Sequence, residues 1–451
     1  MHKRVVVISD LHLGGDQSFQ LCGLSAQKRL TAFFEWLRLS HTRAAETHLV
    51  LAGDVVDFLA ETPWQAFTDN ETAKLKLSRI LERTRPVWDA LKALVESGTT
   101  LTILVGNHDI ELCLPGPEGV LREFFKPVEI DIKLDDQPLL IGPVLIDHGN
   151  RYDSWNVVRR DILEELRNEL INGHLPQPFP TVPGSELVVQ VMNPLKQNYP
   201  FIDSLKPETY AAIPLLAILN PRSLADLNKV VRFFRQYART LPATGFMQFS
   251  DDLGLISSGA ESDKAEEALN KARRLVGQNE VGFLSDVGTF REIWQAIRAG
   301  RRGDKVEQLD RMLQALRYAA ENINLTYDLY NEEESYLNSA KEAATRGHSV
   351  IVYGHTHLAK SISLGYNNAM YFNAGTWGNV LKIPSEVLED CDQLRARVAI
   401  ERFADALIAD AGKDFLEQHS TFVQIDLQGG SVSEACLFSF EDSERIKVLK
   451  S

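Results

Sequence analysis

Residues 5–12 read Val-Val-Val-Ile-Ser-Asp-Leu-His, so a short apolar run leads directly into a polar cluster. Four consecutive β-branched residues predict a buried strand. The same change, from an apolar run to a cluster of Asp, Asn or His, occurs at four further places. The five clusters lie at 10–12, 53–57, 106–109, 147–150 and 354–357. Because ligands collect at the carboxyl ends of strands in α/β sheets, we expect the five clusters to build one site.

The segments around these clusters alternate between strand and helix patterns. Apolar residues at helical spacing in 25–43 and 71–96 predict crossover helices between the first strands. This alternation indicates an α/β fold class. The other predicted strands are 48–52, 101–105, 143–146, 349–353, 369–372, 421–425 and one that ends at Phe440, and residues 428–430 predict a hairpin turn before the last strand.

The pattern changes after residue 153. From 155 to about 346 the sequence is mostly helical, with predicted helices at 156–172, 223–239, 260–276, 289–298, 305–321 and 332–345. We therefore predict a catalytic domain formed by residues 1–154 and 347–451, with a small helical excursion at 384–417, and an inserted helical domain at 155–346. The insertion follows one polar cluster and ends just before another, so we expect it to be a lid over the site.

The composition is that of a folded globular protein with an acidic surface. The 451 residues carry 48 Lys and Arg against 62 Asp and Glu, a formal net charge of -14. This charge repels polyanions, so it disfavours nucleic acid and anionic membrane as general partners. The longest apolar run, 210–219, contains Pro214 and is much shorter than the about 20 residues of a membrane span. No transmembrane segment is predicted.

The four cysteines are scattered along the chain without a Cys-x-x-Cys pair. This distribution argues against a structural zinc knuckle and against a disulfide framework. The first apolar run is too short for the core of a signal peptide. A cytoplasmic location is therefore the simplest expectation.

The side chains of the five clusters suit a pair of divalent metal ions. They offer carboxylate oxygens, a carboxamide oxygen and imidazole nitrogens, a set that fits Mn, Fe, Co, Ni or Zn and is too rich in nitrogen for Ca or Mg alone. Each cluster by itself has a structural alternative: Asp10 can cap a helix, Asp54 can belong to a turn, and His148 can be a buried structural histidine. Together, each after a predicted strand, they favour a metal centre.

As a set, the motifs resemble the calcineurin-like metallophosphoesterase superfamily, whose pattern is D-x-H, G-D-x-x-D/E, G-N-H-D/E, a lone H and then G-H-x-H. All five elements are present, within residues 5–153 and 349–377. The resemblance implies a four-layered α-β-β-α sandwich that holds two metals. It would assign the first metal to Asp10, His12 and His357, the second to Asn107, His148 and His355, a bridging position to Asp54, catalysis to His108 and its orientation to Asp109. We interpret Asp57 as a supporting or helix-capping carboxylate.

The same resemblance implies a hydrolase of phosphoester or phosphoanhydride bonds, acting as a phosphodiesterase, phosphatase or pyrophosphatase. A hydroxide bridging the two metals would attack phosphorus in line. The substrate would be a small or lipid-linked phosphate compound, with Arg151 as the best-placed residue for contacting it. The apolar segments of the lid offer a peripheral contact with membranes. The metal pair, the bond preference and the oligomeric state stay open.

Two other functions remain as alternatives. A nuclease of the same superfamily is disfavoured by the acidic charge. A metal-binding scaffold without turnover is disfavoured by the intact ligand set and by His108. Two tryptophans, Trp64 and Trp377, are candidates for stacking on a base or for packing in the core. Three cationic clusters in the insertion are candidate phosphate sites or solvated helix faces: Arg232, Arg235 and Arg239; Lys271, Arg273 and Arg274; Arg298, Arg301 and Arg302.

Overall fold

The computed structural model describes most of the chain outside the middle of the predicted insertion. The described residues are 2–15, 20–40, 45–135, 137–153, 155–205, 328–388, 392–410, 412–441 and 445–449, with 306, 309, 310, 313, 314, 316 and 317 in addition. The helices predicted at 223–239, 260–276 and 289–298, most of the helix at 305–321, the apolar run 210–219 and the three cationic clusters lie outside these residues.

Two β-sheets form the centre of the protein. The first has seven strands in the order β14-β13-β12-β1-β2-β3-β4, and the second has five in the order β5-β6-β7-β9-β8. Strands β1 to β4 are parallel to one another, and so are β6, β7 and β9. The strands of the first sheet are β1 (His2–Ile8), β2 (Ala45–Ala52), β3 (Thr100–Leu104), β4 (Asp131–Lys133), β12 (Thr421–Gln428), β13 (Ser431–Glu441) and β14 (Arg445–Leu449). Those of the second are β5 (Leu139–Ile141), β6 (Val144–Ile146), β7 (Val350–Tyr353), β8 (Lys360–Ser363) and β9 (Met370–Asn373).

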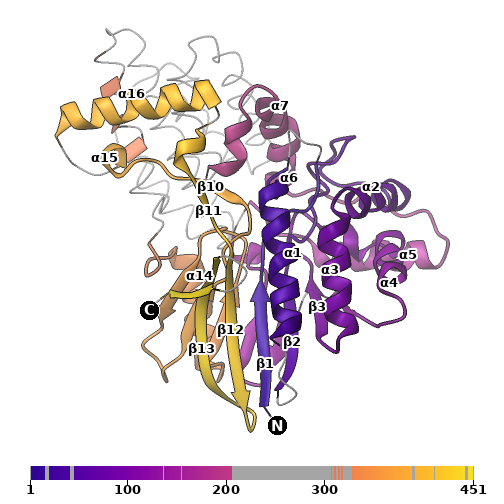
Figure 1. The fold of residues 1–451 in the computed structure, drawn as a ribbon. Helices are drawn as coiled ribbons and strands as arrows, with labels where there is room; N and C mark the ends of the chain where they lie inside the picture. Colours follow the sequence, from indigo (N-terminus) through magenta and orange to yellow (C-terminus); the bar gives the residue numbers. More distant parts are fainter. Residues whose placement is uncertain are drawn as a thin grey trace, which may run out of the picture.

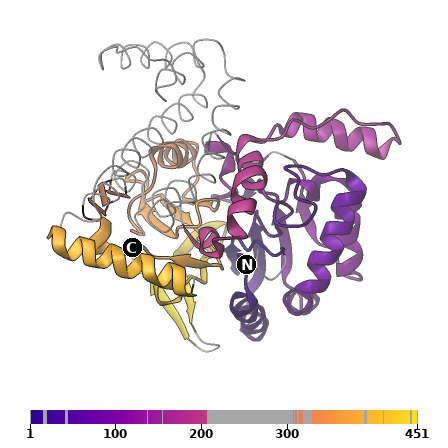
Figure 2. The same cartoon turned by 90° about the horizontal axis from the view of Figure 1, so that it is seen from above.

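Helices pack on both sheets, and further helices follow them in the chain. The longer helices are α1 (Leu24–Leu39), α2 (Asn70–Arg83), α3 (Arg85–Glu96), α4 (Pro115–Phe125), α5 (Arg160–Ile171), α14 (Glu334–Thr345) and α16 (Gln393–Asp410). The short ones are α6 (Pro183–Leu187), α7 (Asn193–Lys196), α15 (Ser385–Leu388), a π-helical turn (Val188–Met192) and 3-10 turns at Ile110–Cys113, Asn150–Tyr152, Pro200–Ser204 and Lys413–Phe415. The predicted excursion at 384–417 also contains β11 (Leu416–Gln418), which pairs with β10 (Asn379–Leu381). In both views α5 and α16 lie on opposite sides of the molecule (Figures 1 and 2).

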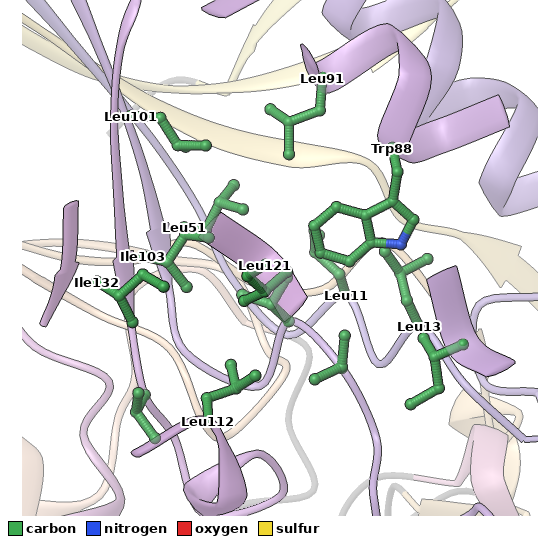
Figure 3. Packing of buried hydrophobic residues seen from close by; sticks show 14 of the residues in the cluster. Leu11, Leu13, Leu51, Trp88, Leu91, Leu101, Ile103, Leu112, Leu121 and Ile132 are labelled. Atoms are coloured by element: carbon green, nitrogen blue, oxygen red, sulfur yellow. The ribbon is translucent and has the colours of Figure 1, made fainter. Parts of the chain in front are cut away.

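Three clusters of buried apolar side chains hold these elements together. One lies between the first sheet and the helices α1, α3 and α4, where Leu51 and Ile103 meet Trp88 and Leu121 (Figure 3). A second lies between the two sheets and joins Val5 and Val7 of β1 to Val352 of β7. The third packs the other face of the second sheet, through Tyr353, against Tyr336 and Ala340 of α14. Burial on both faces explains why the strands read as continuous apolar runs.

The two ends of the chain meet in the first sheet. β1 is antiparallel to β12, with Val5 opposite Ile425, and the two ribbons run side by side in Figure 1. On the helical side of this pair, the ring of Phe33 lies 4.8 Å from that of Trp377, 5.1 Å from Phe422 and 5.4 Å from Phe440. Trp377 is fully buried and donates its indole N–H to the carbonyl of Thr421. Of the two roles considered for Trp377, core packing is therefore the correct one.

The structure corrects one predicted helix and confirms the hairpin. Residues 71–96 form two helices, α2 and α3, with Thr84 between them, because Pro86 lies in the first turn of α3 and has no N–H to continue the helix from α2. β12 and β13 are joined directly through residues 429 and 430, as predicted. Within the described part of the chain, none of the helices has the length and apolar character needed to cross a bilayer.

Replacing Phe33 tests the aromatic contact between the two ends of the chain. We expect Phe33→Ala to lower the free energy of unfolding by about 3–5 kcal/mol, because it opens a cavity among rings from α1, β12 and β13. Urea unfolding followed by fluorescence measures this change. Leu39→Ala in the same helix is the control, since Leu39 is 74% exposed and its loss should change the free energy by less than about 0.5 kcal/mol. A loss below 1 kcal/mol for Phe33→Ala would contradict this interpretation.

Candidate metal centre

The five polar clusters follow the carboxyl ends of β1, β2, β3, β6 and β7, so they come from both sheets. Backbone hydrogen bonds join neighbouring clusters: Asp10 N donates to Gly53 O at 3.2 Å, and Gly354 N donates to His148 O at 2.9 Å. The ring of His148, which follows β6 of the second sheet, contacts the end of β2 in the first sheet, with Nδ1 2.8 Å from Ala52 O. The expectation that the clusters meet at one place agrees with these contacts.

One group of predicted ligands comes from the first and last clusters. The Nε2 atoms of His12 and His357 are 3.1 Å apart, and Asp10 Oδ1 lies 3.4 Å from His357 Nε2. Ligand atoms of these three buried residues all lie within 4.8 Å of one another. The other oxygen of Asp10, Oδ2, accepts a hydrogen bond from His355 N at 2.9 Å. Asp10 therefore ties the last cluster to the first while Oδ1 faces the histidines.

A second group is formed by Asp54, His148 and His355, whose ligand atoms also lie within 4.8 Å of one another. His148 Nε2 is 3.3 Å from Asp54 Oδ2 and 3.2 Å from Asn107 Oδ1. The same Oδ2 of Asp54 lies 3.7 Å from His12 Nε2 in the first group. Asp54 thus lies close to residues of both groups, and its role as a bridging ligand stays a prediction.

Strained backbone marks the same residues. Among the described residues, seven that are not glycine have positive φ, and five of these are predicted ligands: Asp10 (54°), His12 (46°), Asp54 (50°), His355 (70°) and His357 (63°). Side chains rarely adopt this left-handed region, and such strain gathers at functional sites, where the surrounding structure enforces it. The turns after these strands therefore adopt an unfavourable backbone conformation that directs the side chains into the site.

The donor set fits divalent cations. Ala52 O can only accept, so His148 Nδ1 carries a proton, and Nε2 faces the oxygens of Asp54 and Asn107. Acceptors that face one another in a buried space need a cation or a proton between them. A mixed set of carboxylate, carboxamide and imidazole donors matches the metals predicted from the sequence.

The charges of the buried carboxylates depend strongly on their neighbours. Burial is the main cause that raises the pKa of Asp10, and His148 opposes it. Burial would also raise the pKa of Asp54, but the charges of His148, His108 and His12 outweigh it and lower that pKa. For His148, burial lowers the pKa, whereas Asp54 and Asp10 raise it to about 10. Positive charge on the neighbouring histidines therefore offsets the cost of burying the charged carboxylates of Asp10 and Asp54.

Asp57 contacts the ring of His108, whereas Asp109, the residue predicted to orient it, is held by backbone amides. Asp57 Oδ1 lies 3.2 Å from His108 Nδ1, and Oδ2 lies 3.2 Å from His12 Nδ1. Both oxygens of Asp109 accept backbone amides instead, from Gly106 at 2.6 Å and from Val55 at 2.7 Å. The amide contacts turn Asp109 inward, where burial and the charge of Asp54 raise its pKa to about 6. Asp57 also accepts from the amides of Leu59 and Ala60, in keeping with its predicted supporting role.

Two polar residues that the sequence analysis missed, Asp153 and Asn156, lie at the site, on either side of the predicted boundary at 154/155. His355 Nε2 lies 2.9 Å from Asp153 Oδ2, and Asn107 Nδ2 donates to Asn156 Oδ1 at 3.2 Å. The only sequence signal for them is their position shortly after His148. Arg151, the predicted substrate contact, forms an ion pair with Asp147 at 2.7 Å and is about one third exposed. Its role toward a substrate stays a prediction.

Comparison with known proteins finds one family. The family model for the calcineurin-like phosphoesterase matches residues 3–201, which include four of the five clusters. No curated protein matches the chain. The fifth cluster, which contains His355 and His357, lies outside the matched residues and joins the other four through the contacts described above.

Gly106 provides a test of how closely the clusters are packed. A Cβ at this position would lie 2.1 Å from Asp54 Oδ1 and 2.7 Å from Asp54 N. We expect Gly106→Ala to displace the Asp54 carboxylate and to weaken Mn²⁺ binding by at least about tenfold, measured by isothermal titration calorimetry.

The matched control is Gly119→Ala in α4, where a Cβ meets nothing within 4 Å. It should bind Mn²⁺ as the parent does and unfold no earlier, because alanine favours a helix over glycine by about 1 kcal/mol. Unchanged Mn²⁺ affinity in Gly106→Ala would show that the position of Asp54 does not determine binding.

Proposed function

We propose that this chain, whose residues 3–201 match the calcineurin-like phosphoesterase family model, is a hydrolase of phosphoester or phosphoanhydride bonds that depends on two divalent metals. The observation that carries the proposal is the pair of groups Asp10, His12, His357 and Asp54, His148, His355, which lie at the ends of four strands, with Asp54 close to both and Asn107 added from a fifth strand. The substrate class is a small or lipid-linked phosphate compound. The charge of -14 supports this class over nucleic acid.

Within this proposal, Asp10, His12 and His357 hold one cation, and Asn107, His148 and His355 hold the other, with Asp54 shared. Bound divalent ions, of the Mn, Fe, Co, Ni or Zn class, activate water and offset the charge on a phosphoryl group. The protein supplies the positions. Hydrogen bonds from His355 N to Asp10 and from His108 N to Asp54 fix each carboxylate across two clusters.

His108 is proposed as the acid that protonates the leaving oxygen. Its ring is 20% exposed, more than the ring of His12 beside it, and its Nδ1 is held by Asp57. Nε2 is then the nitrogen that exchanges a proton with the substrate. A positioned acid of this kind contributes about 10²–10⁴ in rate.

We further propose that the core is a four-layered α-β-β-α sandwich made of residues 1–154 and 347–451, and that 155–346 form a lid. The three apolar clusters, one between the sheets and one on each outer face, support the layers. The lid is supported by contacts beside both junctions of the insertion: Tyr336, near its end, lies 6.2 Å from Tyr152 between ring centroids, and the hydroxyls of Tyr152 and Tyr353, which flank the insertion, are 3.4 Å apart. The scattered cysteines keep the cytoplasm as the proposed compartment.

Two variants separate metal binding from catalysis. We expect Asp54→Ala to lose both metals together, because its carboxylate stands between the two groups. We expect His108→Ala to keep both metals and to lose about 10²–10⁴ in kcat. Metal analysis of the dialysed proteins, with hydrolysis of bis-p-nitrophenyl phosphate and p-nitrophenyl phosphate in added Mn²⁺, measures both effects.

Each outcome decides between the proposal and its alternatives. Full activity of His108→Ala would remove its role as the acid. Metal bound without turnover on either ester or on nucleotide pyrophosphates would favour a scaffold. Cleavage of DNA that falls steeply with salt would favour a nuclease.

A further inference from the structure

Two polar residues on either side of the predicted boundary at 154/155 lie beside the candidate metal centre. Asp153 lies five residues after His148, and its Oδ2 is 2.9 Å from His355 Nε2 in the last cluster. Asn156 follows three residues later, and its Oδ1 accepts a hydrogen bond from the side-chain Nδ2 of Asn107 at 3.2 Å. Asp153 and Asn156 are themselves bonded, with Asn156 Nδ2 2.7 Å from Asp153 Oδ2. One bonded pair therefore contacts two predicted ligands, one after β3 of the first sheet and one after β7 of the second.

Each contact determines which atom its partner presents to the centre. A carboxylate accepts hydrogen bonds, so His355 carries its proton on Nε2 and keeps its lone pair on Nδ1. The amide of Asn107 donates from Nδ2, so its Oδ1 is turned toward His148 Nε2, 3.2 Å away. Outer carboxylates and carbonyls that orient metal-binding histidines act in this way in many metal sites.

We propose that Asp153 and Asn156 form one positioning unit for the second metal, which fixes His355 as an Nδ1 ligand and Asn107 as an Oδ1 ligand. This inference rests on the proposed function. The unit spans the predicted boundary, with Asp153 in the last residues of the catalytic part and Asn156 in the first residues of the insertion, so the start of the insertion contributes to assembling the metal centre.

The surroundings hold the unit in place. Asp153 Oδ1 accepts from Trp155 N at 2.9 Å, and Asn150 Nδ2 donates to the carbonyl of Asn156 at 2.7 Å. The start of α6 presses on the same side chain, because a Cβ on Gly184 would lie 2.1 Å from Asn156 Oδ1. A substitution at Gly184 can therefore displace the Asn156 side chain while leaving Asn156 itself unchanged.

The test measures metal binding rather than turnover alone. Titration calorimetry with Mn²⁺ and metal analysis of the dialysed protein are applied to Asp153→Ala, Asn156→Ala and Gly184→Ala. We expect each variant to retain one ion with the affinity of the parent and to bind the other about 10–100-fold more weakly. Saturating Mn²⁺ should restore most of the lost kcat on bis-p-nitrophenyl phosphate, since the residues orient ligands and do not touch the substrate.

Two further variants make the test specific. Asp161→Asn is the control, because Asp161 lies on the exposed surface of α5 in a pair with Arg159, and it should bind two ions as the parent does. The double variant Asp153→Ala/Asn156→Ala should lose less affinity than the product of the two single losses, because the residues act as a unit. Circular dichroism and thermal unfolding confirm that each protein is folded.

The outcomes separate this inference from the proposed function. If the parent binds two ions and hydrolyses the ester while Asp153→Ala and Asn156→Ala bind both ions unchanged, the positioning unit is wrong and the function stands. Equal weakening of both ions in the single variants would also overturn it. A parent protein that binds fewer than two ions would overturn both.

Discussion

The structure depends on bringing the acceptor atoms of seven side chains together in a space that excludes most water. Asp10, Asp54 and Asn107 are each at most 3% exposed, and Asp54 faces histidine nitrogens from two clusters. Such crowding of acceptors is unfavourable without positive charge between them. The left-handed backbone at five ligand positions and the close approach at Gly106 are consequences of the same requirement. The fold tolerates them because the parallel strands and their buried faces fix where each turn begins.

The connection between β6 and β7 explains why the insertion begins at the metal centre. These strands are parallel neighbours, so the chain that leaves the carboxyl end of β6 must return to the amino end of β7. It leaves at the end where His148 lies, and it returns through α14, which packs on the outer face of the second sheet. Any segment added to this crossover therefore starts beside the ligands. Asp153 and Asn156 show the consequence, since they contact His355 and Asn107 before the chain moves away.

The sequence predicted the strands that carry the five polar clusters, because they follow from local patterns, whereas the short strands β4, β5, β8, β10 and β11 and the last strand β14 were missed. A β-branched run followed by Asp, Asn or His identifies a strand and its functional end without any knowledge of pairing. Even the break at Thr84 had a local signal in Pro86. The contact of His108 had none: Asp109 is adjacent in sequence, but the turn directs it to the amides of Gly106 and Val55, while Asp57 arrives from 51 residues away. Asp153 is 202 residues from His355, so no spacing rule could have paired them.

Asp57 also suggests why the acid and the first metal are connected in this protein. One carboxylate contacts Nδ1 of His12 and Nδ1 of His108, whose ring centroids are 4.7 Å apart. Two backbone amides hold Oδ1 in addition, so the carboxylate cannot turn to satisfy one ring without losing the other. Movement of the His12 ring therefore shifts the carboxylate that also holds the ring of His108. In the proposed site, this shared carboxylate would keep the proposed proton donor aligned with the ligands, and the proposed Asp153–Asn156 unit would do the same for His355 and Asn107.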